Sequence, residues 1–71
     1  MMFNYDKLKG KIKEKFGTQE NFAKAIGLSN TSISFKLNNK SEWSQQEIGK
    51  AAKLLEIADN EIALYFFAVL V

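Results

Sequence analysis

The sequence contains neither cysteine nor histidine, and these two absences exclude several kinds of chemistry. Without cysteine there can be no disulfide and no thiolate ligand for a metal, which fits the reducing cytoplasm, where we expect this protein. Without histidine the chain lacks the usual zinc ligand and the usual general base. Its carboxylates are scattered, and no glycine-rich phosphate loop occurs. We therefore expect no enzymatic activity, no cofactor, no metal and no small-molecule substrate.

Arginine and long hydrophobic runs are absent as well. All ten basic residues are lysines, so the guanidinium fork that most often contacts guanine is not available. The longest apolar run, residues 62–71, contains ten residues, about half of what a membrane span needs. The N-terminal residues lack the apolar segment of a secretory signal. We expect no membrane partner.

The composition that remains fits one small helical domain over residues 1–71. A chain of 71 residues buries only about 60% of the surface that it exposes when unfolded. Hydrophobic residues make up 46% of the chain and include nine aromatic ones, which is enough for a helical core. No alternating strand pattern competes with the helical periodicity. We expect an all-α domain.

The lysines are unevenly distributed along the chain. Residues 1–40 contain eight lysines and three acidic residues, whereas residues 41–71 contain two lysines and five acidic residues. The first part therefore has a net charge of +5 and the second a net charge of −3, which gives the +2 of the whole chain. This asymmetry indicates one end that meets a polyanion and one that does not. A lysine-rich solvated helix face would produce the same composition.

Residues 18–38 form the most informative pattern, which predicts two short helices joined by a tight turn. Thr18 is the expected N-cap of the first helix, in which Phe22 and Ile26 share one face. Gly27 is suited to end this helix, because a residue without Cβ adopts the left-handed conformation without strain.

The second helix of this pattern begins at Ser29 or Asn30, either of which can cap it. Its buried side is expected to consist of Ile33 and Leu37, which lie four residues apart. The opposite side is a strip of short polar groups with one aromatic ring: Thr31, Ser34, Phe35 and Asn38. Solvated helix faces usually carry longer charged side chains, so this strip indicates a contact surface.

This stretch resembles the helix-turn-helix of the phage repressor and Cro family. The matching residues keep the family's order: Gln19, Phe22, Ala23, Ile26, Gly27, Leu28 and Ile33. The motif covers about a third of the chain, and the flanking segments fit the same lambda-repressor-like domain of five helices. In one departure, Lys36 stands where the family usually has an apolar residue, and Leu37 is expected to take the buried place.

The resemblance implies that the second helix enters the major groove of operator DNA while the first lies across the backbone. Base contacts are then expected from the start of the second helix and one turn further on: Asn30, Thr31, Ser34 and Phe35. Phe35 is about 200° around the helix from Ile33 and should face outward, unless the helix is rotated and the ring is partly buried.

Contacts to DNA phosphates are expected next to these residues. The resemblance assigns Gln19 a phosphate contact and a role in bracing the recognition helix. The end of that helix and the following loop add four more candidates: Lys36, Asn38, Asn39 and Lys40. Such contacts position a protein on DNA without reading its sequence.

Helical periodicity predicts one helix before this motif and two after it. The first should be capped by Asn4, end at Gly17 and bury a single stripe: Tyr5, Leu8, Ile12 and Phe16. The fourth should begin at Ser44, because the run from Ser44 to Glu47 is a complete capping box. Trp43 is expected to pack on Ile48 or to cover the edge of the core.

The last helix is predicted from about Glu61, capped by Asp59 or Asn60, and it has no polar face. One sector should cover the core: Ile62, Tyr65, Phe66, Val69 and Leu70. The opposite sector is expected to pack on a partner subunit: Leu64, Phe67 and Val71. A helix that is apolar all round has to be buried all round, which so small a domain cannot achieve alone. A frayed apolar tail is the alternative.

Two functions remain open from the sequence. The first is a small Cro-like phage transcriptional regulator that binds double-stranded operator DNA as a homodimer. The second is a modulator or antirepressor that acts mainly by binding a related phage repressor protein. The first is the leading interpretation, and the low net charge, the absence of arginine and the apolar C-terminus keep the second open.

Overall fold

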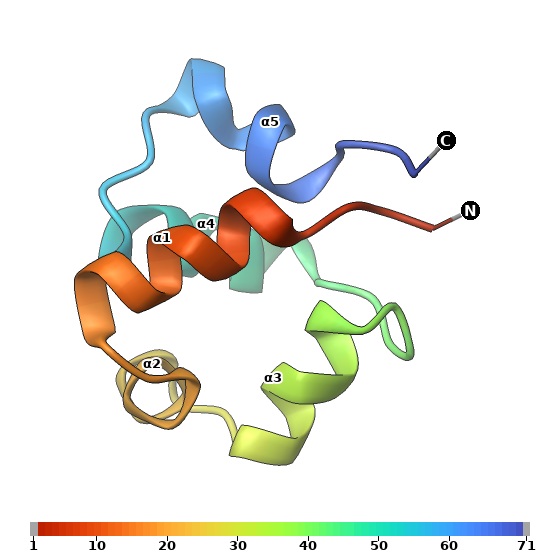
Figure 1. Cartoon of the computed structure of the whole chain (residues 1–71). Coiled ribbons are helices and arrows are strands. Elements are labelled where there is room, and N and C mark those ends of the chain that lie inside the picture. Colours follow the sequence, from red (N-terminus) through yellow and green to blue (C-terminus); the bar gives the residue numbers. More distant parts are fainter. Residues whose placement is uncertain (1, 71) are drawn as a thin grey trace.

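The computed structural model describes residues 2–70, and its helices follow the predicted order (Figure 1). Their bounds are α1 Asp6–Phe16, α2 Gln19–Ile26, α3 Asn30–Leu37, α4 Gln45–Leu54 and α5 Ile62–Phe66, with the short 3₁₀ helix η1 Asp59–Glu61 before α5. Within residues 2–70 the only β pairing is an isolated antiparallel bridge between Phe3 and Val69. The expected all-α fold of five helices is confirmed.

Most helix ends are fixed by local hydrogen bonds that the sequence predicts. The hydroxyl groups of Thr18 and Ser29 accept from backbone N–H groups of α2 and α3 at 3.1 and 3.0 Å. Ser29 is therefore the cap of α3, and Asn30 is its first residue. Gly27 ends α2 with φ of 82°, as expected for a left-handed position. Ser44 and Glu47 form the predicted capping box at the start of α4.

The start of α1 differs by one residue from the prediction. Tyr5 occupies the N-cap position and makes no side-chain cap. The Asn4 side chain still serves the helix start, because its Oδ1 accepts from the backbone N–H of Asp6 at 2.8 Å. Asp6 lies in the first turn, where its negative charge suits the helix dipole.

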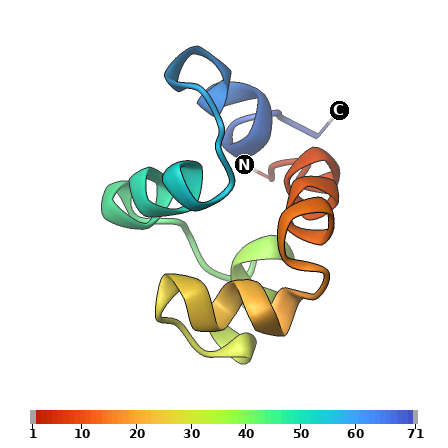
Figure 2. The ribbon, with the colours of Figure 1, turned by 90° about the vertical axis from the view of Figure 1, so that its left-hand side faces the viewer.

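The helices share one core, to which each of the five helical segments contributes. α1 and α4 lie on opposite sides, α2 and α3 close one end, and α5 closes the other (Figures 1 and 2). The centre of the core consists of five fully buried side chains from successive segments: Leu8, Phe22, Ile33, Leu55 and Phe66. Trp43 covers the edge of this core, with its ring 5.3 Å from that of Phe66 in an edge-to-face arrangement.

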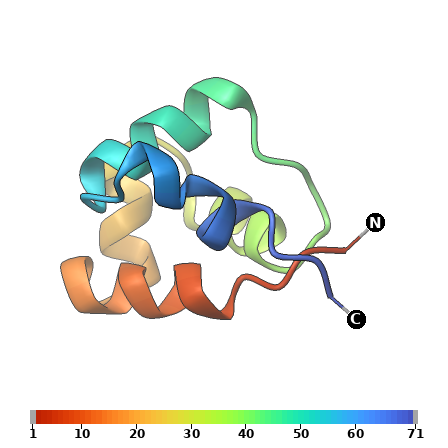
Figure 3. The same cartoon turned by 90° about the horizontal axis from the view of Figure 1, so that it is seen from above.

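The last helix is much shorter than the prediction. α5 ends at Phe66, and residues 67–70 leave the helix and run beside residues 2–4 (Figure 3). The predicted caps Asp59 and Asn60 make no such contact; Asp59 begins η1 instead. Tyr65 and Phe66 are buried as expected. Val69 and Leu70 were placed on the same buried sector, and this prediction is wrong, since both are about half exposed outside the helix.

An ion pair joins the end of α3 to the start of α4. The Lys36 ammonium lies 2.9 Å from a carboxylate oxygen of Glu47, and both side chains are largely shielded from solvent. Burial alone would raise the pKa of Glu47. The Ser44 backbone N–H and the Lys36 ammonium outweigh that effect and hold this pKa below its ordinary value of 4.5. The pair therefore stabilises the fold most when Glu47 is ionised.

Among the described residues, no helix combines the length and the apolar character that a membrane crossing requires.

Glu47→Gln should lower the free energy of unfolding at neutral pH by about 1–2 kcal/mol, since a charged hydrogen-bond partner of Lys36 is lost. Because the folded state depresses the pKa of Glu47, its contribution is present above pH 4.5 and disappears as the pH falls through the folded pKa. Chemical denaturation between pH 3 and pH 7 measures both effects.

The matched control for this prediction is Glu14→Gln. Glu14 pairs with Lys11 at 3.5 Å, but its side chain is 61% exposed, so removing its charge should change stability little. Equal losses in the two variants, or a pH dependence that survives in Glu47→Gln, would contradict the assigned role of Glu47.

Candidate interaction surfaces

α3 presents a mostly polar outer face beside its buried side. Ile33 and Leu37 are buried, which fixes the rotation of the helix as predicted. Asn30 and Thr31 are exposed, Ser34 is half-buried, and Phe35 is 47% exposed. The four predicted base-contacting residues therefore lie on the free side of α3. The alternative of a rotated helix does not apply, although the Phe35 ring is about half covered.

Gln19 connects the start of α2 to the start of α3. Its side-chain amide donates to Oδ1 of Asn30 at 3.1 Å. This bond braces α3 against α2, as the sequence resemblance implies, and it occupies the acceptor of the Asn30 amide. In this arrangement the Asn30 side chain presents its NH₂ group as a donor to a ligand.

Lys36 does not belong to the exposed surface. Its side chain is only 12% exposed, and its ammonium donates to the Glu42 carbonyl at 2.8 Å besides pairing with Glu47. The same ammonium lies 5.9 Å from the centre of the Trp43 ring. The prediction of a phosphate contact for Lys36 is therefore corrected. Position 36, which is usually apolar in the resembling family, points inward here too, and the Glu47 carboxylate and the Glu42 carbonyl bind the lysine.

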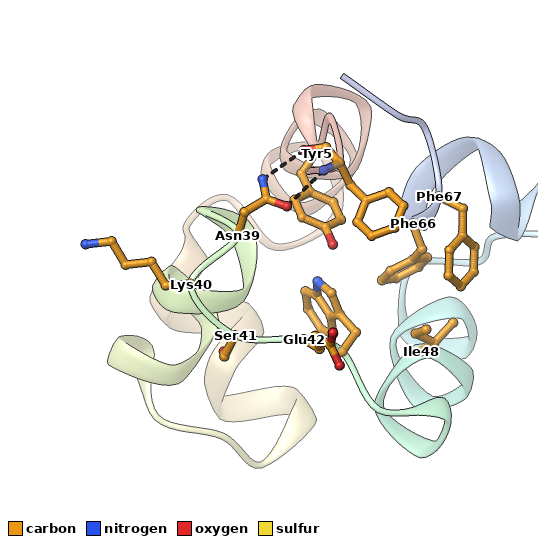
Figure 4. A pocket seen from close by; sticks show the side chains of 10 residues that line it. Tyr5, Asn39, Lys40, Ser41, Glu42, Ile48, Phe66 and Phe67 are labelled. Atoms are coloured by element: carbon orange, nitrogen blue, oxygen red, sulfur yellow. Dashed lines mark hydrogen bonds between the residues drawn. The ribbon is translucent and has the colours of Figure 1, made fainter. Parts of the chain in front are cut away.

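Asn39 also points inward. Its Oδ1 accepts from the backbone N–H of Phe3, and its Nδ2 donates to the Phe3 carbonyl, each at 2.9 Å (Figure 4). Both polar ends of the amide are thus occupied by one residue of the N-terminal segment. The prediction that Asn39 contacts a phosphate is corrected for this reason.

Asn38 and Lys40 remain at the surface, as a phosphate contact requires. The Asn38 amide lies near the Ser34 hydroxyl at 3.4 Å, a long and weak hydrogen bond. The Lys40 ammonium lies 5.7 Å from the centre of the Phe35 ring, within the range of a cation–π contact. Of the predicted phosphate-binding residues, only Gln19, Asn38 and Lys40 therefore remain available for such a contact.

A second surface consists of exposed apolar side chains on α5 and at both chain ends. We call it the terminal apolar patch, and it comprises Met2, Leu64, Phe67, Val69 and Leu70. Leu64 and Phe67 are 53% and 50% exposed, as a partner-binding role requires, whereas Val71 lies outside the described residues. Clusters of exposed apolar side chains mark interaction sites more often than ordinary surface.

A cavity of about 510 Å³ separates the loop after α3 from the end of α5 (Figure 4). Its lining includes Tyr5, Glu42, Trp43 and Phe67. The indole N–H of Trp43 is buried and has no hydrogen-bond partner among the described residues. Burial, and secondarily the nearby Glu42 carboxylate, raises the pKa of Tyr5. The cavity is thus an aromatic recess beside the terminal apolar patch.

Sequence patterns did not predict this recess or the contact between Asn39 and Phe3. The recess brings together residues from both ends of the chain and from the middle loop, and no local periodicity connects these segments. The one available signal was Asn39 itself, since asparagine at the position that follows a helix C-cap often adopts positive φ. Its value here is 62°.

The fold and the sequence are similar to those of a phage protein of solved structure. The solution structure of the modulator of repression (MOR) of the temperate bacteriophage TP901-1 from Lactococcus lactis is 51% identical in sequence, with a TM-score of 0.82. The match covers 94% of this chain and 90% of that chain. No curated protein matches significantly. Residues 1–69 match the model of a family described as a protein of unknown function, DUF739, and the chain therefore belongs to that family.

Proposed function

We propose that this protein is a phage regulator that modulates repression by binding a repressor protein through the terminal apolar patch. The observation that carries this proposal is the exposed apolar surface around Phe67, in a chain 51% identical to a phage modulator of repression. The proposal adopts the antirepressor alternative from the sequence rather than the operator-binding function.

The energetics of the patch support a protein partner. Met2, Leu64, Phe67, Val69 and Leu70 are each about half exposed, so a partner could remove much additional apolar area from water. Each Å² of apolar surface removed from water is worth about 25 cal/mol. Phe67 is the natural centre of such a contact, because aromatic side chains in recesses dominate binding energy.

Charge supports a partner with a basic surface. Residues 41–71 carry a net charge of −3, whereas the cavity beside Phe67 is lined by one carboxylate, Glu42, and one ammonium, Lys40. Repressors present basic surfaces where they bind DNA. We expect a repressor held on the patch to be withdrawn from its operator, which requires no chemistry from this chain.

Phe67→Lys should weaken binding to the phage repressor encoded beside this protein at least about 30-fold, the effect of losing an aromatic hot spot. Phe67 is half exposed and follows the end of α5, where its ring packs edge-to-face on that of Phe3, so helical circular dichroism should not change. Isothermal titration calorimetry gives the affinity.

Ala25→Lys is the matched control for this test, because it adds the same charge at an exposed position of α2. It should leave repressor affinity unchanged. A folded Phe67→Lys protein that binds the repressor normally would refute the proposal. If sedimentation instead shows loss of self-association alone, the patch is a homodimer interface.

Operator binding is a second candidate, favoured by one observation: the polar face of α3 is free and is braced by the bond between Gln19 and Asn30. Thr31 and Phe35 would contact bases, while Asn38 and Lys40 would contact phosphates. The set of phosphate contacts is small, because Lys36 and Asn39 are engaged internally. We therefore expect weak binding with a shallow dependence on salt concentration, because the slope scales with the number of phosphates that the protein neutralises.

In a mobility-shift titration on the neighbouring intergenic DNA, Lys40→Ala should reduce the slope of log affinity against log salt by about one unit. Thr31→Ala should cost about 1–3 kcal/mol on the operator and much less on random DNA. Lys53→Ala, at an exposed position of α4, is the control and should leave the slope unchanged. Absence of any specific shift would exclude this candidate.

A further inference from the structure

Asn39 directly follows the C-cap of α3 and adopts the left-handed conformation, with φ of 62°. The backbone N–H of Lys40 donates to the Phe35 carbonyl at 2.8 Å, and that of Asn39 reaches the Lys36 carbonyl at 3.4 Å. These two bonds form the common helix-ending motif in which glycine is the usual left-handed residue. Asparagine is more strained than glycine there but adds a side-chain amide.

The Asn39 amide makes the two hydrogen bonds to the N-terminal segment that a neighbouring β-strand would make. It binds both the N–H and the carbonyl of Phe3 on one edge of residues 2–4. On the other edge, the Asn4 N–H donates to the Ala68 carbonyl at 2.6 Å, and the Leu70 N–H donates to the Met2 carbonyl at 3.0 Å. Residues 2–4 are therefore held between Asn39 and the C-terminal segment 68–70.

The terminal apolar patch depends on this arrangement, because its C-terminal part lies beyond the last helix. Val69 and Leu70 follow the end of α5 and are about half exposed, so core packing orders them little. Their neighbour is the N-terminal segment, paired through the bridge between Phe3 and Val69. A two-stranded pair by itself is marginally stable in water. Phe3 packs against the core and, edge-to-face at 5.9 Å, against Phe67, and the two bonds from Asn39 add polar support to this pair.

We infer that Asn39 is a positioning residue for partner binding: its amide fixes the paired chain ends and thereby preforms the terminal apolar patch. This inference rests on the proposed function, since it concerns the same surface. We assign its amide no hydrogen bond to the partner, because both polar ends are occupied by Phe3. It raises the fraction of molecules in which Met2, Val69 and Leu70 are already in place, and apparent affinity scales with that fraction.

Asn39→Gly tests the inference, because glycine keeps the left-handed helix end and removes only the amide. Repressor affinity should fall about tenfold, the loss expected if the patch is preformed in about a tenth of the molecules. Hydrogen exchange at the Asn4 and Leu70 amides should accelerate, while exchange in α1–α4 stays unchanged. The double variant Asn39→Gly, Val69→Ala should lose less binding free energy than the sum of the losses in the two single variants, because Asn39 acts through the segment that holds Val69.

Asn21→Ala is the matched control, since the Asn21 amide donates to the Phe16 carbonyl at 3.0 Å, at the junction of α1 and α2. This substitution removes a comparable side-chain hydrogen bond and should leave repressor affinity within about twofold of that of the unsubstituted protein. If Asn39→Gly and Asn21→Ala lose repressor affinity equally, Asn39 has only a structural role and the inference is overturned. Normal affinity of Asn39→Gly beside weak binding of Phe67→Lys would also overturn it, with the proposed function intact. Normal affinity of both variants would refute the proposed function, and the inference with it.

Discussion

Burial of five large side chains at the centre of a very small core is the constraint on which the rest of the structure depends. Leu8, Phe22, Ile33, Leu55 and Phe66 are fully buried, and each comes from a different segment. A chain of 71 residues has little interior beyond this layer. Once Tyr65 and Phe66 have closed the core, no space remains for the apolar residues that follow. They stay at the surface, where they form the terminal apolar patch.

The sequence predicted the helices well where a helix end depends on neighbouring residues. Thr18, Ser29 and Ser44 accept from backbone groups three residues away, and Gly27 needs only its own freedom at positive φ. These caps and this helix-ending glycine can be inferred from short sequence motifs. The rotation of α3 was also predictable, because Ile33 and Leu37 specify one buried side.

The errors concern residues whose surroundings are set by distant segments. Lys36 and Asn39 are residue types that often bind phosphate. In the folded protein, however, Lys36 pairs with Glu47 and Asn39 bonds to Phe3, and no local pattern indicates these internal partners. The C-terminal run was predicted as a longer helix because an uninterrupted apolar sequence contains no residue that marks where a helix ends. The pairing of Phe3 with Val69 joins the two ends of the chain and is beyond any periodicity.

The two candidate surfaces are adjacent, and Lys40 belongs to both. Its ammonium lies over Phe35 on the α3 side, and its side chain also lines the recess next to Phe67. A protein seated in the recess would therefore contact one of the few surface lysines left for phosphate. Because Lys36 is already engaged internally, losing Lys40 would leave the end of α3 and the loop after it with no free ammonium among the described residues. Partner binding would thus weaken any DNA contact directly, without a conformational change.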